Sequence, residues 1–196
     1  MSSALVVMDV QNGIVERVGD RAEELLAAVA GAVAAAREAG VPVLFVRVAF
    51  REGTPEVSAN NRAFSALSSS SSMGEAHPAT QVHPAVEPAP GEVVVTKRRV
   101  SAFAGSDLDV VLRAQGVDHL VLCGIATSGV VLSTVRQAAD LDFALTVLAD
   151  ACADADPEVH RVLLEKVFPR QAEVTTTAAW AAGLARPGGA ESAPVG

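Results

Sequence analysis

Short apolar runs recur along the chain. Uninterrupted runs of this length, rich in Val, Leu and Ala, are typical of strands that are buried on both faces of a parallel sheet. The runs cover residues 4–8, 41–48, 92–97, 118–124, 143–150 and 172–177. The pattern therefore predicts about six strands.

Segments with helical spacing lie between these runs. Residues 20–39 place Leu and Val at helical intervals and stop at Gly40, which suits the left-handed position after a helix. Residues 106–116 offer Ser106 or Asp107 as a cap and also end in glycine. Two more helices are expected at 128–140 and 157–168.

The alternation of strands and helices predicts an α/β fold, because parallel strands need crossover helices that cover the sheet. We expect three layers in a Rossmann-like arrangement, with a central, mostly parallel sheet. One domain spans residues 1–184, and residues 185–196 form a flexible tail rich in Gly, Ala and Pro. Residues 51–92 form a long irregular excursion with several prolines and a serine run at 68–72, and such segments are functional or mobile.

Composition narrows the function classes. The formal charge is −8, from 23 acidic and 15 basic residues, which argues against a nucleic-acid partner. No apolar run approaches the roughly 18 residues of a membrane span, and the N-terminus lacks the basic region of a signal peptide. Cys123 and Cys152 stand apart from any CxxC spacing, as expected in a reducing compartment. We therefore expect a cytoplasmic protein without a membrane partner.

Ligands of open α/β sheets bind outside the carboxyl ends of the strands. Asp9 follows the first run, Lys97 ends the third, and the loop 124–128 joins the fourth to a helix. These groups are expected to converge, although Asp9 alone also suits a turn. The Lys97 cation would lower the pKa of Asp9 and burial would raise it, so the direction of the pKa shift stays open. Asp150 suits a loop or cap.

The other charged groups carry weaker signals. Arg98 and Arg99 suit either an anionic substrate or a solvated edge. The four histidines show no triad or metal-ligand spacing, and each is expected to be structural or to lie at the surface. They are His77, His83, His119 and His160.

Taken together, three segments resemble the isochorismatase-like (cysteine hydrolase) superfamily. They are ALVVMDVQNG, VVVTKRRVSAF and LVLCGIATSGVVLSTVRQAADLDFALTVLADACAD, and the resemblance spans residues 4–177. It implies a hydrolase in which Asp9 is the general base or acid and Lys97 orients and polarises around it. It also implies that Phe103 is a pocket wall or a core residue. The loop expected to hold a cis peptide, the oxyanion hole and substrate contacts comprises Ile125, Ala126, Thr127, Ser128 and Gly129.

The chain departs from this family at the nucleophile. The family's cysteine stands six residues after the glycine that corresponds to Gly124, and here that position is Val130. An isopropyl side chain cannot attack a carbonyl carbon. Neither Cys123 nor Cys152 matches the position. The hydroxyls of Thr127, Ser128 and Ser133 lie near it in sequence, with no histidine base evident beside them.

Three functional hypotheses remain open. The first is a cysteine-independent hydrolase that acts on a small polar or anionic molecule. The second is a catalytically silent member that binds a small molecule or serves assembly, and the third is an amidohydrolase with a relocated nucleophile. No histidine follows the second strand, so we expect no metal, and no cofactor is implied. The resemblance also implies a homo-oligomer, a dimer or larger.

Overall fold

The computed structural model describes residues 2–68 and 71–185, and a six-stranded sheet runs through its centre. The strand order is β3-β2-β1-β4-β5-β6, and every neighbouring pair is parallel. The strands are β1 (Ser3–Met8), β2 (Val43–Val48), β3 (Val93–Lys97), β4 (His119–Ile125), β5 (Ala144–Ala153) and β6 (Glu173–Thr175). The predicted α/β class and the number of strands are therefore confirmed.

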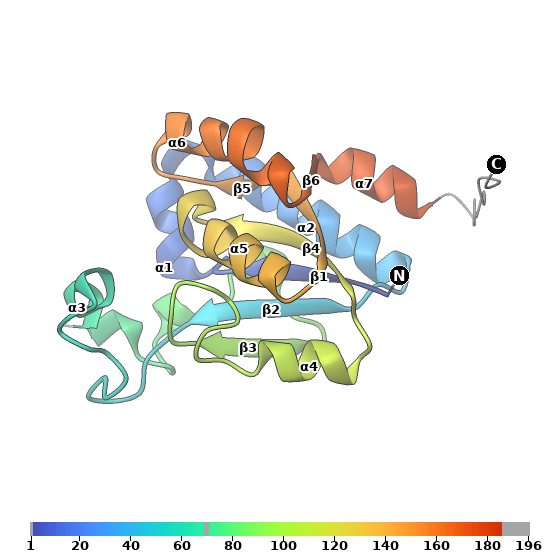
Figure 1. The fold of residues 1–196 in the computed structure, drawn as a ribbon. Helices are drawn as coiled ribbons and strands as arrows, with labels where there is room; N and C mark the ends of the chain where they lie inside the picture. Colours follow the sequence, from blue (N-terminus) through green and yellow to red (C-terminus); the bar gives the residue numbers. More distant parts are fainter. Residues whose placement is uncertain (1, 69–70, 186–196) are drawn as a thin grey trace.

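Helices cover both faces of the sheet and complete three layers. Figure 1 shows α5 in front of the central strands and α2 behind them, and α2 packs against β5 and α7. The α-helices are α1 (Asn12–Val15), α2 (Ala22–Glu38), α3 (Arg62–Ser68), α4 (Leu108–Ala114), α5 (Leu132–Asp140), α6 (Pro157–Val162) and α7 (Thr177–Leu184). A π-type turn, Thr127–Val131, precedes α5, and a second one, Leu163–Val167, follows α6.

The structure differs from the sequence prediction at two elements. Strand β5 continues to Ala153, so Asp150 and Cys152 lie in the strand and not in a loop. The pairing of β5 with β4 shifts between Leu122 and Gly124. This irregularity lets the strand continue through residues that do not favour strands. Helix α7 was not predicted, because its alanine-rich sequence has no apolar period.

Residues 51–92 are less irregular than predicted. Besides α3 they contain three short 3-10 turns, Ser71–Met73, Pro78–Thr80 and Pro84–Val86. Phe50, Phe64 and Met73 form a small second core with Val48, and the two phenylalanine rings meet edge to face with centroids 5.5 Å apart. Residues 69–70 of the serine run and the predicted tail from residue 186 lie outside the described residues.

The arrows of β2 and β3 in Figure 1 point to the side that holds α1 and α3, and the other strands run parallel to them. The carboxyl ends of the strands and the excursion after β2 therefore share one edge of the molecule. Within the described ranges, no helix has both the length and the apolar character needed to cross a membrane.

Candidate active site

Asp9 and Lys97 meet at the carboxyl edge, as the sequence predicts. The Lys97 Nζ lies 2.9 Å from the Asp9 Oδ2, and the two side chains are only 2% and 7% exposed, respectively. The ammonium also donates to the main-chain oxygen of Arg99 at 3.0 Å. Because Lys97 is paired with Val48 across β2 and β3, its side chain extends over the end of β2 to reach Asp9. The sheet thus places a buried ion pair where parallel sheets bind ligands.

The Asp9 carboxyl group has an unused oxygen. Its Oδ1 is buried and has no hydrogen-bond partner among the residues that the structure describes. Burial raises the pKa of Asp9 above the ordinary value, and the Lys97 ammonium offsets only part of this rise. The backbone of Asp9 is left-handed, with φ of 56°, which an aspartate tolerates better than most residues. The direction of the Asp9 pKa shift, which the sequence left open, is therefore upward, because burial outweighs the Lys97 cation.

The loop after β4 lies beside Asp9 because β1 and β4 are neighbours, with Met8 paired to Gly124. Gly124 has φ of 144°, and a Cβ atom there would overlap the main-chain carbonyl of Met8. Only glycine fits so close to β1. The peptide bond between Ile125 and Ala126 is cis, as the family resemblance implies.

Two main-chain donors of this loop are already used. The Ser128 N–H donates to Asp154 Oδ2 at 2.7 Å, and the Gly129 N–H donates to the Ala126 oxygen at 3.0 Å. Burial acts to raise the pKa of Asp154, but hydrogen bonds led by that of Ser128 outweigh it and the pKa is lowered. The expected role of Ser128 and Gly129 as oxyanion donors therefore requires these bonds to rearrange.

A histidine lies beside the predicted hydroxyl group, which corrects the sequence interpretation. Thr127 Oγ1 and His160 Nδ1 are 2.8 Å apart, and Thr127 is fully buried. No spacing signal could have revealed this contact, because 33 residues separate the two side chains. His160 belongs to α6, whose position over the loop follows from the packing of the fold.

The two cysteines are buried in the core, away from the position of the family's nucleophile. Val130 is 2% exposed and belongs to the π-type turn that opens α5. Burial raises the pKa of Cys123 well above its ordinary value, and burial also raises the pKa of Cys152 to about 12. Both thiols therefore stay protonated near neutral pH, which makes them poor nucleophiles.

Two further candidates make contacts outside the Asp9–Lys97 pair. Phe103 is buried, and its ring packs against Phe143 with centroids 5.8 Å apart. Because Phe143 precedes β5, this contact favours the core alternative over a pocket wall. Arg98 pairs with Glu56 and Glu75 of the excursion, so it is neither a free anion site nor a solvated edge.

Two more residues considered from the sequence, Asp150 and Ser133, differ in their contacts. Asp150 Oδ1 accepts hydrogen bonds from the Thr177 N–H and hydroxyl at 2.8 and 3.0 Å, so this strand residue holds the first turn of α7, whose N-cap is Thr176. Ser133 lies in the first turn of α5. Neither residue contacts the Asp9–Lys97 pair by any bond that the structure records for the described chain.

Two pockets open near the ion pair. One, of about 460 Å³, is lined by Val48, the strand partner of Lys97, by Gln11, two residues after Asp9, and by Ile14, Arg17 and Met73. Gln11 is buried, and its amide bonds to Val48 and to the Thr80 oxygen. A volume of this size suits a small molecule.

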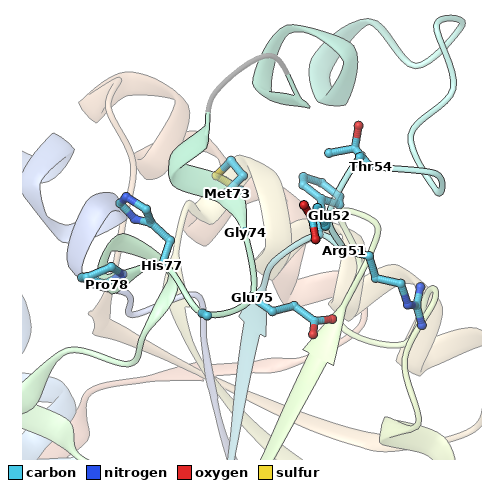
Figure 2. Close-up of a pocket in the computed structure, with 11 residues that line it drawn as sticks. Arg51, Glu52, Thr54, Met73, Gly74, Glu75, His77 and Pro78 are labelled. Atoms are coloured by element: carbon cyan, nitrogen blue, oxygen red, sulfur yellow. The ribbon is translucent and has the colours of Figure 1, made fainter.

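The second pocket, of about 920 Å³, lies above the end of β2. Figure 2 shows Met73 between His77 on one side and Glu52 and Thr54 on the other. Neither pocket is lined by Asp9, Lys97 or Val130. Over the described ranges, no group of three or more His, Cys, Asp or Glu side chains is placed to hold a metal ion.

Comparisons with known proteins agree with this fold. The family model of the isochorismatase domain matches residues 3–179. The chain is 35% identical over 178 residues to the uncharacterized isochorismatase family protein YecD of Escherichia coli O157:H7, with 88% of this chain and 91% of that protein covered.

It is also 36% identical over 207 residues to the ureidoacrylate amidohydrolase RutB of Methylobacterium radiotolerans, with coverage of 93% and 80%. Among solved structures, a cysteine hydrolase from Pseudomonas syringae pv. phaseolicola 1448A superposes with a TM-score of 0.85 at 26% identity. That alignment covers 93% of this chain and 92% of the other.

Proposed function

The chain belongs to the isochorismatase family of hydrolases, and from that premise we propose that it hydrolyses a small polar or anionic molecule without a cysteine nucleophile. The observation that carries this proposal is the buried Asp9–Lys97 pair with its unpartnered carboxylate oxygen. Burying charge in this way is costly, and a chain gains from it where the free oxygen exchanges protons with a substrate.

Asp9 is suited to general acid–base chemistry because burial raises its pKa towards neutrality. As a base, its carboxylate takes a proton from water while the water oxygen bonds to the substrate's carbonyl carbon. The same proton then passes to the leaving nitrogen or oxygen as that bond breaks. Lys97 holds the carboxylate in place and balances its charge throughout.

Substrate access requires movement. Asp9 Oδ1 is shielded from solvent, so side chains beside it must shift before a substrate makes contact. The pocket lined by Gln11 and Val48 is the proposed route, because Gln11 lies two residues after Asp9 and Val48 is the strand partner of Lys97. RutB is named as a ureidoacrylate amidohydrolase, which makes ureides and amides the first substrates to test.

The test is turnover of a panel of ureides, amides and vinyl ethers. We expect Asp9→Asn to reduce kcat by about 10²- to 10⁴-fold, the range for a lost general acid or base. Asparagine tolerates the left-handed backbone at this position and preserves the side-chain shape. Asp109→Asn, which alters an exposed carboxylate paired with Arg113, is the matched control. Turnover that survives Asp9→Asn unchanged would exclude Asp9 as the acid or base.

A relocated nucleophile is the second candidate, and the Thr127–His160 contact is the observation that favours it. The 2.8 Å separation suits a hydroxyl and its base. The complete burial of Thr127 argues against attack on a substrate. A variant with both Cys123→Ala and Cys152→Ala should keep full activity, whereas loss of activity on removing either thiol would restore a cysteine mechanism.

A silent, ligand-binding member is the third candidate, favoured by the shielding of Asp9 Oδ1. It predicts no turnover across the panel together with binding of a panel molecule. Such binding, measured by calorimetry and weakened by Asp9→Asn, would replace the hydrolase proposal.

A further inference from the structure

The loop that carries Val130 is held by a cluster of side chains outside the Asp9–Lys97 pair. His160 contacts the hydroxyl of Thr127, and Asp154 accepts the N–H of Ser128. Arg21, just before α2, donates to the main-chain oxygen of Asp154. Two side chains therefore contact two consecutive loop residues, and Arg21 in turn holds one of the two, Asp154, through its main-chain oxygen.

This cluster lies opposite Asp9 across the loop. Strand β4 lies between β1 and β5 in the sheet, and the loop follows β4 directly. Asp9 follows β1 on one side, whereas Asp154 and the α6 residue His160 follow β5 on the other. The loop is thus held from the β5 side and presents its remaining surface towards β1.

We propose that His160 is a positioning residue that, through Thr127, holds the loop 125–130 at a fixed place beside Asp9. The proposal rests on the proposed function, since it assigns the loop a role in the same site. A displacement of reacting groups by about 1 Å is enough to slow a reaction by up to 10²-fold, so one partly buried hydrogen bond that holds the loop has a measurable effect on rate. Asp154 supports the same loop through the Ser128 N–H.

His160 can be altered without opening the core. The residue is partly exposed and lines a pocket of about 330 Å³ with Arg21 and Cys152. Burial and the Arg21 guanidinium lower the pKa of His160, and Asp154 offsets part of this effect. The imidazole is therefore mostly neutral at pH 7, and its replacement by another neutral side chain changes little besides the hydrogen bond.

The protein contains its own control for this interaction. His119 Nε2 and Thr146 Oγ1 are 3.0 Å apart, and this second Thr–His pair is also partly buried. His119 begins β4 and Thr146 lies near the start of β5, so the pair sits at the amino edge of the sheet. It joins the same residue types at the end of the sheet remote from Asp9.

The experiment compares Thr127→Val, His160→Leu and their combination with Thr146→Val and His119→Leu. Hydrogen exchange of peptides covering residues 124–131 is measured first, together with Tm. We expect faster exchange there in the first set alone and a fall of Tm in both sets, with the larger fall in His119→Leu because His119 also bonds to Ser3. His160→Asn, whose amide can occupy the Nδ1 position, should restore slow exchange. Unchanged exchange in His160→Leu would overturn the proposal.

Kinetics on a panel substrate then tests the effect on catalysis. We expect Thr127→Val and His160→Leu each to lower kcat about tenfold with KM within about twofold, and the double variant to lose no more than either single one. The amino-edge variants should stay within about twofold of wild type. A kcat that stays at the wild-type value while Tm falls shows a structural role only, and a loss beyond about 10³-fold in Thr127→Val makes Thr127 a nucleophile; either overturns the proposal.

Failure of the proposed function is distinguishable from failure of this inference. If the wild type cleaves no panel substrate, or if Asp9→Asn leaves turnover unchanged, the hydrolase proposal based on Asp9 fails. Hydrogen exchange at residues 124–131 does not depend on turnover and still decides whether His160 holds the loop.

Discussion

The two edges of the sheet use similar polar residues in different ways. At the amino edge, His119 bonds to both Ser3 and Thr146, and the Arg113–Asp109 ion pair is about half exposed. At the carboxyl edge, the charges of Asp9 and Lys97 are almost fully buried, and one carboxylate oxygen has no recorded partner in the described chain. These amino-edge groups have partners. At the carboxyl edge Asp9 Oδ1 is unsatisfied among the described residues, as is Glu56 Oε2 in the excursion beside it, and such local conflicts concentrate at functional sites.

The largest effect that separates the two edges is expected from glycine substitution. Gly124→Ala at the carboxyl edge should lower the free energy of unfolding by about 4 kcal/mol or more, because the new methyl group overlaps the Met8 carbonyl. Gly116→Ala also lies at a positive φ but meets no atom within 4 Å, so about 1 kcal/mol is expected. Urea denaturation of both variants measures the difference. Equal losses would show that backbone conformation, and not the contact with β1, requires Gly124.

The next largest effect concerns the buried cation. Lys97→Met should lower the free energy of unfolding by about 3 kcal/mol at pH 7, because it leaves the Asp9 carboxylate buried without its partner. The loss should shrink at acid pH, where Asp9 takes up a proton. Urea titrations at pH 7 and pH 4 test this expectation. A variant as stable as the wild type at pH 7 would mean that Asp9 is already neutral in the folded protein.

The pH dependence of stability should have opposite signs at two aspartates of the carboxyl edge. The folded-state pKa of Asp9 lies above its ordinary value of 3.8, so the stability it contributes is present below that pH and is lost as the pH rises through the raised pKa. The folded-state pKa of Asp154 is lowered, so its contribution is present above 3.8 and is lost as the pH falls.

Urea titrations of wild type, Asp9→Asn and Asp154→Asn over a series of pH values measure both contributions. The stability of wild type relative to Asp9→Asn should decrease with rising pH, and relative to Asp154→Asn it should increase. The same slope in both comparisons would contradict the assigned pKa directions.

The smallest effect is expected at the amino edge. Asp109→Asn should change the free energy of unfolding by no more than about 0.5 kcal/mol, because its ion pair with Arg113 spans one helical turn and is largely solvated. Thermal unfolding at low and high salt checks this. A loss of more than about 1 kcal/mol would remove the contrast between the edges.

Much of the candidate site could be predicted from the ends of the strands. Parallel strands bring their carboxyl ends to one edge, so the positions of Asp9, Lys97 and the loop after Gly124 sufficed to predict their convergence. The roles of Phe103 and Arg98 could not be predicted. Their contacts with Phe143 and Glu75 join segments whose mutual approach has no periodic signal.

The amino-acid sequence by itself determined the class of fold, the order of its strands along the chain and the valine at position 130, because these follow from apolar patterning and from residue identity. Only the tertiary structure decided that burial outweighs Lys97 in setting the pKa of Asp9, since desolvation depends on every neighbour of the carboxyl group. The packing of α6 likewise placed His160 against Thr127. Periodicity describes how each element meets the core, whereas contacts between distant side chains arise only when the layers are assembled.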